Sequence, residues 1–534
     1  MTTLGSSTRS MAVGTIASRG TGFLRNAAIV AVLGVHTVGA AYNVANTTPN
    51  IVYELLLGGV LTSVVVPVLV RAAKTDEDGG EVYAQRLLSL VIVTLLVASV
   101  LLVVLAPQLV ALYMPGERPE TRQLATVLAR YFLPQMLFYG AGAVMGAILN
   151  VRERFAAPMW APVANNLVVV ATCVLFVLLP GSSRVSAGSI TGAQELLLGL
   201  GTTLGIVAQT VALLPSLRRA GFRFRFRTDL RGAGLGEIGR LGRWILLYVV
   251  ANQAAFVVVV DLANQHRLNQ SGRGFTSFAS AYVLWQLPHA VIAVSVITAL
   301  LPRMSRAAAD GRLGDLRDAL NRGLRLTVAV LVPAAVGFLV LGQALATVVY
   351  GHLRTSTGEA RFIGTLLAVF GLGLVPFSVY QLQLRAFYAL KDTRTPTLIN
   401  LWVNVTVVAV DVPLYLVLPD RLKVIGLGVG QSASFAVGLL VCSRVLSRRI
   451  GGLAGAAVVR TAVRCLVAAA VPGLVAAGVV AAVGRTVGED TVGALLALGL
   501  GTAVLGAGYV AVARRMRVAE LDDVVGPLVA RLGR

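Results

Sequence analysis

The sequence has little charge. Only 13% of its 534 residues are Asp, Glu, Lys or Arg, which is about half the share found in an ordinary soluble domain. In contrast, 56% of the residues are hydrophobic, and the mean hydropathy is +0.80. A chain of this composition cannot cover a water-soluble surface, so it is predicted to be an integral membrane protein of the all-α class.

The sequence is also poor in the residues and motifs of catalytic and metal sites. Its three cysteines, Cys173, Cys442 and Cys465, all fall in apolar segments, and their spacing excludes a disulfide framework or a zinc site. The chain contains no Walker A, G-x-S-x-G or H-E-x-x-H pattern. We therefore expect a protein that is not an enzyme and has no cofactor or soluble catalytic domain.

The formal net charge is +22 because acidic residues are scarce. In a soluble protein this balance would indicate a nucleic-acid partner. Here the basic residues gather in the connections between apolar segments, where Lys and Arg determine membrane topology. No nucleic-acid partner is expected.

Fourteen segments are long and apolar enough to cross a bilayer, which takes roughly 20 residues per helix. These predicted spans cover residues 11–35, 41–70, 87–114, 125–149, 159–180, 194–217, 241–263, 276–302, 323–350, 363–389, 396–418, 424–446, 461–484 and 492–513. When both termini are placed in the cytoplasm, roughly seven in ten of the basic residues fall on that side, as the positive-inside rule requires. The prediction is a multi-pass plasma-membrane protein with both ends cytoplasmic.

An internal duplication is visible. The stretch from Ala147 to Val170 resembles the stretch from Ala386 to Ala409, pairing Arg152 with Lys391 at an offset of 239 residues. A second pair of stretches, near residues 67 and 302, matches at an offset of 235. We predict an N-lobe at 1–220, a C-lobe at 221–450 and two extra helices at 451–534. The two six-helix lobes would be related by a pseudo-two-fold axis along the membrane normal.

Two arginines interrupt the first apolar segment, "ASRGTGFLRN". Arg19 and Arg25 flank Gly22 at a spacing of three residues, and an arginine at the bilayer centre costs at least about 2.5 kcal/mol. Guanidinium groups match phosphate oxygens, so the three residues are candidates for binding an anionic substrate. The alternative is that the arginines pair with Glu54 or with backbone carbonyls and hold helices together.

The second segment carries a polar stripe. Asn43, Asn46, Asn50 and Glu54 follow at intervals of three, four and four residues, and so share one helix face. This pattern is typical of a helix that lines a wet cavity, and the four residues are predicted to contact substrate. A ladder of interhelical hydrogen bonds is the alternative interpretation.

Further polar side chains lie in later segments. Asn252 in the seventh segment and Asn400 and Asn404 in the eleventh offer oxygen ligands for a coupling cation such as Na⁺. Asp261 and Asp411 lie nearby, close to the ends of their segments, where they also fit an interfacial position. The coupling ion is left open between sodium and the proton.

The connection from Leu217 to Gly232 alternates Arg with Phe between Phe222 and Arg227. One interpretation is a cytoplasmic retention loop that obeys the topology rule. The other is that its rings enter the membrane interface while its arginines meet anionic headgroups.

Several stretches together resemble the MurJ/MviN lipid II flippases, in particular actinobacterial members, within the larger multidrug/oligosaccharidyl-lipid/polysaccharide exporter superfamily. They are "SRGTGFLRN", "AYNVANTTPNIVYELLLGG" and "FTSFASAYVLWQLPHAVIAVSVITALLPRMSRAAADG". The resemblance implies translocation of an undecaprenyl-diphosphate-linked peptidoglycan precursor by alternating access around a cationic cavity. It implies that Arg19 and Arg25 meet the substrate diphosphate. Membrane lipids and the proteins of cell-wall synthesis and division are the implied partners.

The sequence departs from the family pattern at several positions. Ala40 stands where many members have an acidic residue, and Tyr53, Glu54 and Val283 stand where better-known members have arginines. The cavity is therefore expected to be less cationic. Two alternatives are an exporter of drugs or of another lipid-linked oligosaccharide, and a non-transporting paralogue that scaffolds cell-wall synthesis.

Overall fold

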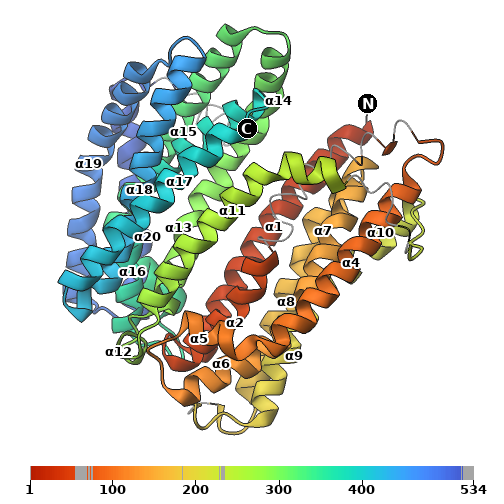
Figure 1. The fold of residues 1–534 in the computed structure, drawn as a ribbon. Coiled ribbons are helices and arrows are strands. Elements are labelled where there is room, and N and C mark those ends of the chain that lie inside the picture. Colours follow the sequence, from red (N-terminus) through yellow and green to blue (C-terminus); the bar gives the residue numbers. More distant parts are fainter. Residues whose placement is uncertain are drawn as a thin grey trace. The chain divides into compact units, whose positions relative to one another are not determined.

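The structure is a computed structural model that describes residues 2–53, 69, 72–73, 76–182, 185–227, 229, 235–518 and 520. Over these residues every regular element is a helix, as Figure 1 shows. The chain divides into two compact units, Met1–Thr276 and Ser277–Arg534. The lobe boundaries 1–220, 221–450 and 451–534 stay a prediction.

Unit 1 begins with the two helices that carry the candidate anion site. Its helices are α1 (Thr2–Leu33), α2 (Thr37–Tyr53), α4 (Glu81–Val104), α5 (Ala106–Tyr113), α6 (Pro119–Phe132), α7 (Gln135–Val151), α8 (Ala156–Leu178), α9 (Gly192–Val211), α10 (Leu214–Arg219), α11 (Leu235–Ala263) and α12 (His266–Gln270). Helix α8 packs between α1 and α9, while α2 packs against α6 and α7. Small and apolar side chains fill these contacts, because lipid leaves packing and hydrogen bonds as the main forces between helices.

Unit 2 contains longer helices. They are α13 (Phe275–Pro288), the π-helical turn η4 (His289–Ala293), α14 (Val294–Ala309), α15 (Leu313–Tyr350), α16 (Thr357–Ala389), α17 (Arg394–Val417), α18 (Asp420–Arg449), α19 (Gly455–Thr486) and α20 (Thr491–Arg515). Helices α15 and α16 approach closely, since a Cβ atom on Gly364 would lie 2.3 Å from the Cα of Gln343. Glycine at this position allows the two backbones to touch.

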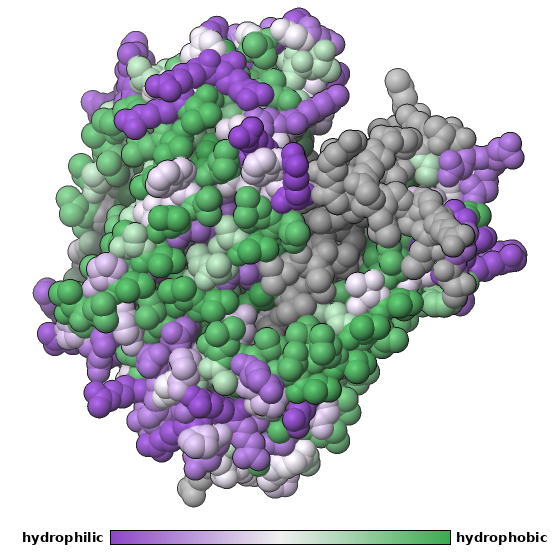
Figure 2. Space-filling model, viewed as in Figure 1, coloured by the Kyte–Doolittle hydropathy of each residue, from purple (hydrophilic) through white to green (hydrophobic). Residues whose placement is uncertain are grey.

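Twelve helical stretches of the described residues are long and apolar enough to cross a membrane. They correspond to the third to fourteenth predicted spans. The first two predicted spans correspond to α1 and α2, so a total of fourteen stays a prediction. On the face seen in Figure 2, apolar side chains cover the middle of unit 2 and polar ones gather toward its two ends. This distribution suits a surface surrounded by lipid.

The duplication is present in the structure, but at a different register. The second residue after α7, Glu153, has a φ of 59°, and the second residue after α16, Lys391, has a φ of 58°. These equivalent turns are 238 residues apart, and so are the first residues of α8 and α17. The offset of 239 residues, which paired Arg152 with Lys391, is therefore wrong by one. Short apolar helices tolerate such a slip in a sequence comparison, whereas helix ends do not.

Three connections of unit 1 meet at one buried carboxylate. The side chain of Glu117, after α5, is fully buried; one oxygen contacts His266 Nδ1 and the other accepts a hydrogen bond from Asn269 Nδ2 at 3.0 Å. His36 Nδ1, between α1 and α2, lies 3.3 Å from the carbonyl oxygen of Asn269. This cluster fixes the ends of four helices relative to one another within the unit.

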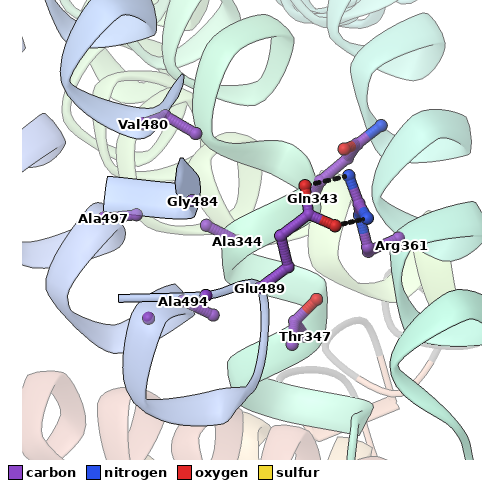
Figure 3. A pocket seen from close by; sticks show the side chains of 11 residues that line it. Gln343, Ala344, Thr347, Arg361, Val480, Gly484, Glu489, Ala494 and Ala497 are labelled. Atoms are coloured by element: carbon purple, nitrogen blue, oxygen red, sulfur yellow. Dashed lines mark hydrogen bonds and ion pairs between the residues drawn. The ribbon is translucent and has the colours of Figure 1, made fainter. Parts of the chain in front are cut away.

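The last two helices are joined to unit 2 by small side chains and one ion pair. Figure 3 shows Arg361 of α16 facing Glu489, in the connection between α19 and α20, beside a cavity of about 60 Å³. The Arg361 Nη2 atom donates to Glu489 Oε1 at 3.1 Å, and Nη1 contacts Oε2. Both side chains are partly exposed, so the pair contributes at most about 1 kcal/mol.

Candidate functional site

Both predicted arginines lie well inside α1. The helix ends at Leu33, so Arg25 lies roughly 12 Å from that end at 1.5 Å per residue. Arg19 is exposed, whereas Arg25 is half-buried. Among the described residues, no carboxylate forms an ion pair with either of them. Glu54, the predicted alternative partner, lies outside the described residues.

The side chain of Arg25 points into unit 1. Its charge acts on the hydroxyl groups of Tyr42 (α2) and Tyr139 (α7) and on the thiol of Cys173 (α8). The Tyr42 hydroxyl lies 2.9 Å from Thr202 Oγ1 and is already engaged there. The buried Nε atom of Arg25 has no hydrogen-bond partner in the part of the chain that the structure describes. A buried donor of this kind is costly to leave unsatisfied, so the position is suited to an acceptor that arrives from outside the unit.

Gly22 is the point of closest approach between α1 and an amide of α8. A Cβ atom on Gly22 would lie 3.4 Å from Nδ2 of Asn166, whereas one on Gly20 would meet nothing within 4 Å. Asn166 is buried and donates to Thr21 Oγ1 at 3.0 Å and to the carbonyl oxygen of Ser18 at 3.2 Å. Its side chain therefore supports the turn of α1 that carries the two arginines.

Asn166 was not among the predicted site residues. The predicted repeat paired Asn165 with Asn404, but the offset of 238 residues makes Asn166 the equivalent of Asn404. The proline matches at the same offset, Pro158 with Pro396, were the signal in the sequence that could have corrected the register. Each unit thus places an asparagine at the same position of the helix after its repeated turn.

The polar stripe of α2 is present. Asn43, Asn46 and Asn50 are half-exposed, while the neighbouring Tyr42 and Ala45 are buried. Asn43 Nδ2 donates to the carbonyl oxygen of Gly39 at 2.9 Å and to Thr276 Oγ1 at 3.2 Å, and Asn50 Nδ2 donates to the carbonyl oxygen of Asn46 at 3.3 Å. These local bonds favour a helix face that stays solvated over a ladder between helices.

The predicted cation ligands fall in different units. Asn252 is half-buried on α11 of unit 1, and Asn400 and Asn404 lie on α17 of unit 2, where Asn404 Nδ2 donates to the carbonyl oxygen of Asn400 at 2.9 Å. Within the described residues no three His, Cys, Asp or Glu side chains gather as metal ligands. The structure does not bring the three asparagines together, and their role in binding a cation stays a prediction.

The two aspartates near these segment ends differ from each other. Asp411 is fully buried in α17, and a Cβ atom on Gly430 of α18 would lie 1.8 Å from its Oδ1. Neither carboxylate oxygen of Asp411 has a hydrogen-bond partner among the described residues. The interfacial position suggested for Asp411 is therefore wrong, because the close approach of Gly430 covers the side chain. Asp261 is half-buried at the end of α11.

The positions at which the sequence departs from the family pattern are not alike. Ala40 is fully buried in α2, whereas Val283 is half-buried on α13. A carboxylate at position 40 would sit inside unit 1, where alanine instead packs without charge. Tyr53 is the last residue of α2.

Comparison with known proteins gives a consistent result over most of the chain. The family described as "Lipid II flippase MurJ" matches residues 29–491. A relative from Rhizobium meliloti (strain 1021), named "Probable lipid II flippase MurJ", is 27% identical over 399 residues, which cover 73% of this chain and 72% of the relative. A protein of the same name from Thermotoga maritima is 25% identical over 434 residues, covering 81% of this chain and 83% of the relative.

Solved structures share the fold. The structure titled "Lipid II flippase MurJ, inward closed conformation" has a TM-score of 0.72 at 19% identity and covers 95% of this chain and 99% of its own. A transporter of the MOP superfamily from Pyrococcus furiosus has a TM-score of 0.62 at 16% identity, covering 83% and 95% of the two chains. At these identities the likeness establishes the arrangement of helices alone.

Proposed function

This chain belongs to the lipid II flippase MurJ family, and from that premise we propose that it carries lipid II from the inner to the outer leaflet of the plasma membrane by alternating access. Its family is one of transporters, and its helices make it a multi-pass membrane protein. The positive-inside distribution of Lys and Arg supports cytoplasmic termini.

Within unit 1, the proposed binding group for the substrate diphosphate is formed by Arg19, Gly22 and Arg25. The observation that carries this assignment is the buried, unpartnered Nε of Arg25 beside a half-exposed guanidinium. Arg19 adds a second positive charge on the same helix, and Gly22 leaves space between the two side chains. Charge-assisted contacts of guanidinium with phosphate oxygens are among the stronger hydrogen bonds in proteins.

The polar stripe of α2 extends this site. Asn43, Asn46 and Asn50 present half-exposed amides that suit the sugar hydroxyls or the diphosphate of the substrate. Asn400 and Asn404 are proposed to supply oxygen ligands to a coupling sodium ion, because amide and carbonyl oxygens suit a hard cation. Replacing sodium with a large organic cation in a transport assay tests this second assignment separately.

The test of the site is rescue of cells depleted of their own lipid II flippase, together with the accessibility of lipid II in the outer leaflet. Arg19→Ala and Arg25→Ala should each reduce transport by about tenfold to a hundredfold, the value of a hydrogen bond to a charged group. Arg130→Ala is the matched control, since this arginine of α6 is exposed in the same unit.

The two parts of the proposal fail in different ways. Full rescue by both arginine variants would overturn the diphosphate site while leaving the transport function intact. A wild-type chain that inserts into the membrane but never changes the leaflet distribution of lipid II would overturn the function itself.

A further inference from the structure

The arginine- and phenylalanine-rich connection of unit 1 is fixed in place by α4. Gln85 Nε2 donates to the carbonyl oxygen of Arg223 at 2.7 Å, and Arg227 Nε donates to Gln85 Oε1 at 2.8 Å. The Arg227 backbone N–H donates to Ser89 Oγ at 3.0 Å. Gln85 and Ser89 are both buried. A connection that served only to retain positive charge on one side would need no such anchoring.

The start of the same connection is held by the end of α7. Arg152 Nη1 donates to the carbonyl oxygen of Ala220 at 2.6 Å, and the guanidinium lies 5.6 Å from the ring centroid of Phe222. Phe222 is buried, while Phe224 and Phe226 are 46% and 57% exposed. Exposed rings beside arginines are typical of the membrane–water interface.

Beneath this connection lies a groove of about 560 Å³ between α4, α7, α9 and α10. Its walls include Leu88 and Ile92 of α4, Phe138 and Met145 of α7, Leu214 of α10 and Phe224 of the connection. The volume lies within the range of roughly 300–1,000 Å³ that is common for small-molecule sites. The hydroxyl of Thr210, which also lines the groove, donates to the carbonyl oxygen of Phe138 at 2.9 Å. The walls therefore suit an alkyl chain.

The groove also carries two positive charges. Arg218 and Arg223 line it, both side chains are exposed, and within the described residues neither forms an ion pair with a carboxylate. The neighbouring Arg219 and Arg225 are exposed as well but do not line the groove. The positive-inside rule places this connection in the cytoplasm, where the leaflet is rich in anionic lipids.

From this arrangement we infer that unit 1 binds an anionic phospholipid of the cytoplasmic leaflet. One acyl chain occupies the groove between α4, α7 and α9, and the phosphate lies against Arg218 and Arg223. Basic pockets between membrane helices on the cytoplasmic side bind anionic headgroups by the same chemistry. The occupant is a lipid because the groove is apolar, and it is anionic because only the arginines offer unused donors.

The experiment uses the full chain in phosphatidylcholine vesicles that contain phosphatidylglycerol with a photoreactive group in its acyl chain. Labelling is measured on peptides that cover α4 and residues 211–227. The double variant Arg218→Gln/Arg223→Gln should label at least about tenfold less than wild type, since each arginine near a charged surface is worth about one kcal/mol. Arg219→Gln/Arg225→Gln is the matched control, with the same loss of charge in the same connection, and should label like wild type.

A third variant tests the groove without changing charge. Val211 lines it and is half-exposed, so Val211→Trp should fill the groove and displace the alkyl chain without disturbing the interior. Equal loss of labelling in both double variants would overturn the proposal, because it would show that only the bulk surface charge matters. Equal labelling by a phosphatidylcholine probe would also overturn it. The measurement is independent of lipid II transport.

Discussion

Asn166 on α8 donates a hydrogen bond to Thr21 Oγ1 on α1 at 3.0 Å, one residue before Gly22. The same amide donates to the carbonyl oxygen of Ser18, one residue before Arg19. A single buried side chain thus holds the backbone between the two arginines against the neighbouring helix. The geometry of the proposed diphosphate site depends on this contact, because the rotation of α1 determines where both guanidinium groups point.

Replacing Asn166 with leucine should weaken the packing of α1 on α8. Hydrogen bonds between membrane helices contribute about 0.6 kcal/mol on average and up to about 1.7 kcal/mol, and this substitution removes two. We expect the free energy of unfolding in detergent to fall by about 1–2 kcal/mol, as measured by thermal unfolding at fixed detergent concentration. Thr21→Val removes only one acceptor and should have the smaller effect; an equal or larger effect would contradict this account.

Gly22 should tolerate a side chain less well than Gly20. Leucine at position 22 would press against Asn166 and occupy the space between the arginines, and overpacking of this kind costs about 1–3 kcal/mol. Gly22→Leu should therefore reduce lipid II transport, read as rescue of depleted cells. Gly20→Leu is matched in helix propensity and meets nothing within 4 Å, so it should rescue like wild type. Loss of rescue by both variants would assign the defect to the helix as a whole.

Removing the buried carboxylate of Glu117 should destabilise unit 1 strongly. Glu117→Ala leaves His266 and Asn269 without their shared acceptor, and breaking a buried pair in this way costs about 3 kcal/mol. The melting temperature in detergent measures the loss. Glu120→Ala, three residues away and exposed, should change stability by less than about 0.5 kcal/mol. Similar melting temperatures for the two variants would rule out a structural role for the cluster.

In unit 2, the contact of α15 with α16 should be sensitive to a single methyl group. Gly364→Ala would bring a Cβ atom within 2.3 Å of backbone at Gln343, so the two helices must separate, at a cost of about 1–3 kcal/mol. Gly358→Ala, in the first turn of the same helix, meets only a serine hydroxyl at 4.0 Å. We expect reduced expression and a lower melting temperature for the first variant alone, and an unchanged melting temperature for Gly364→Ala would contradict the close approach.

Much of the architecture followed from hydropathy. The third to fourteenth predicted spans each coincide with a helix long enough to cross the membrane, because each must satisfy its backbone within a helix when lipid surrounds it. The duplication was also visible, since charged turn residues recur in both halves. Its register was not, because the αL positions at Glu153 and Lys391 depend on where the helices end and not on which side chains match.

For the candidate site, the sequence by itself determined which residues carry charge and which share a helix face. Arg19, Gly22 and Arg25 follow from their spacing, and the stripe of Asn43, Asn46 and Asn50 follows from helical periodicity. Only the tertiary structure decided which side chains these residues meet. Asn166 and Tyr139 reach α1 from helices more than a hundred residues away, and the groove under Phe224 exists only because that connection folds back onto α4. Periodicity is a local property of one helix, whereas contacts between helices depend on their relative rotation, which in lipid is determined by close packing and by a few hydrogen bonds.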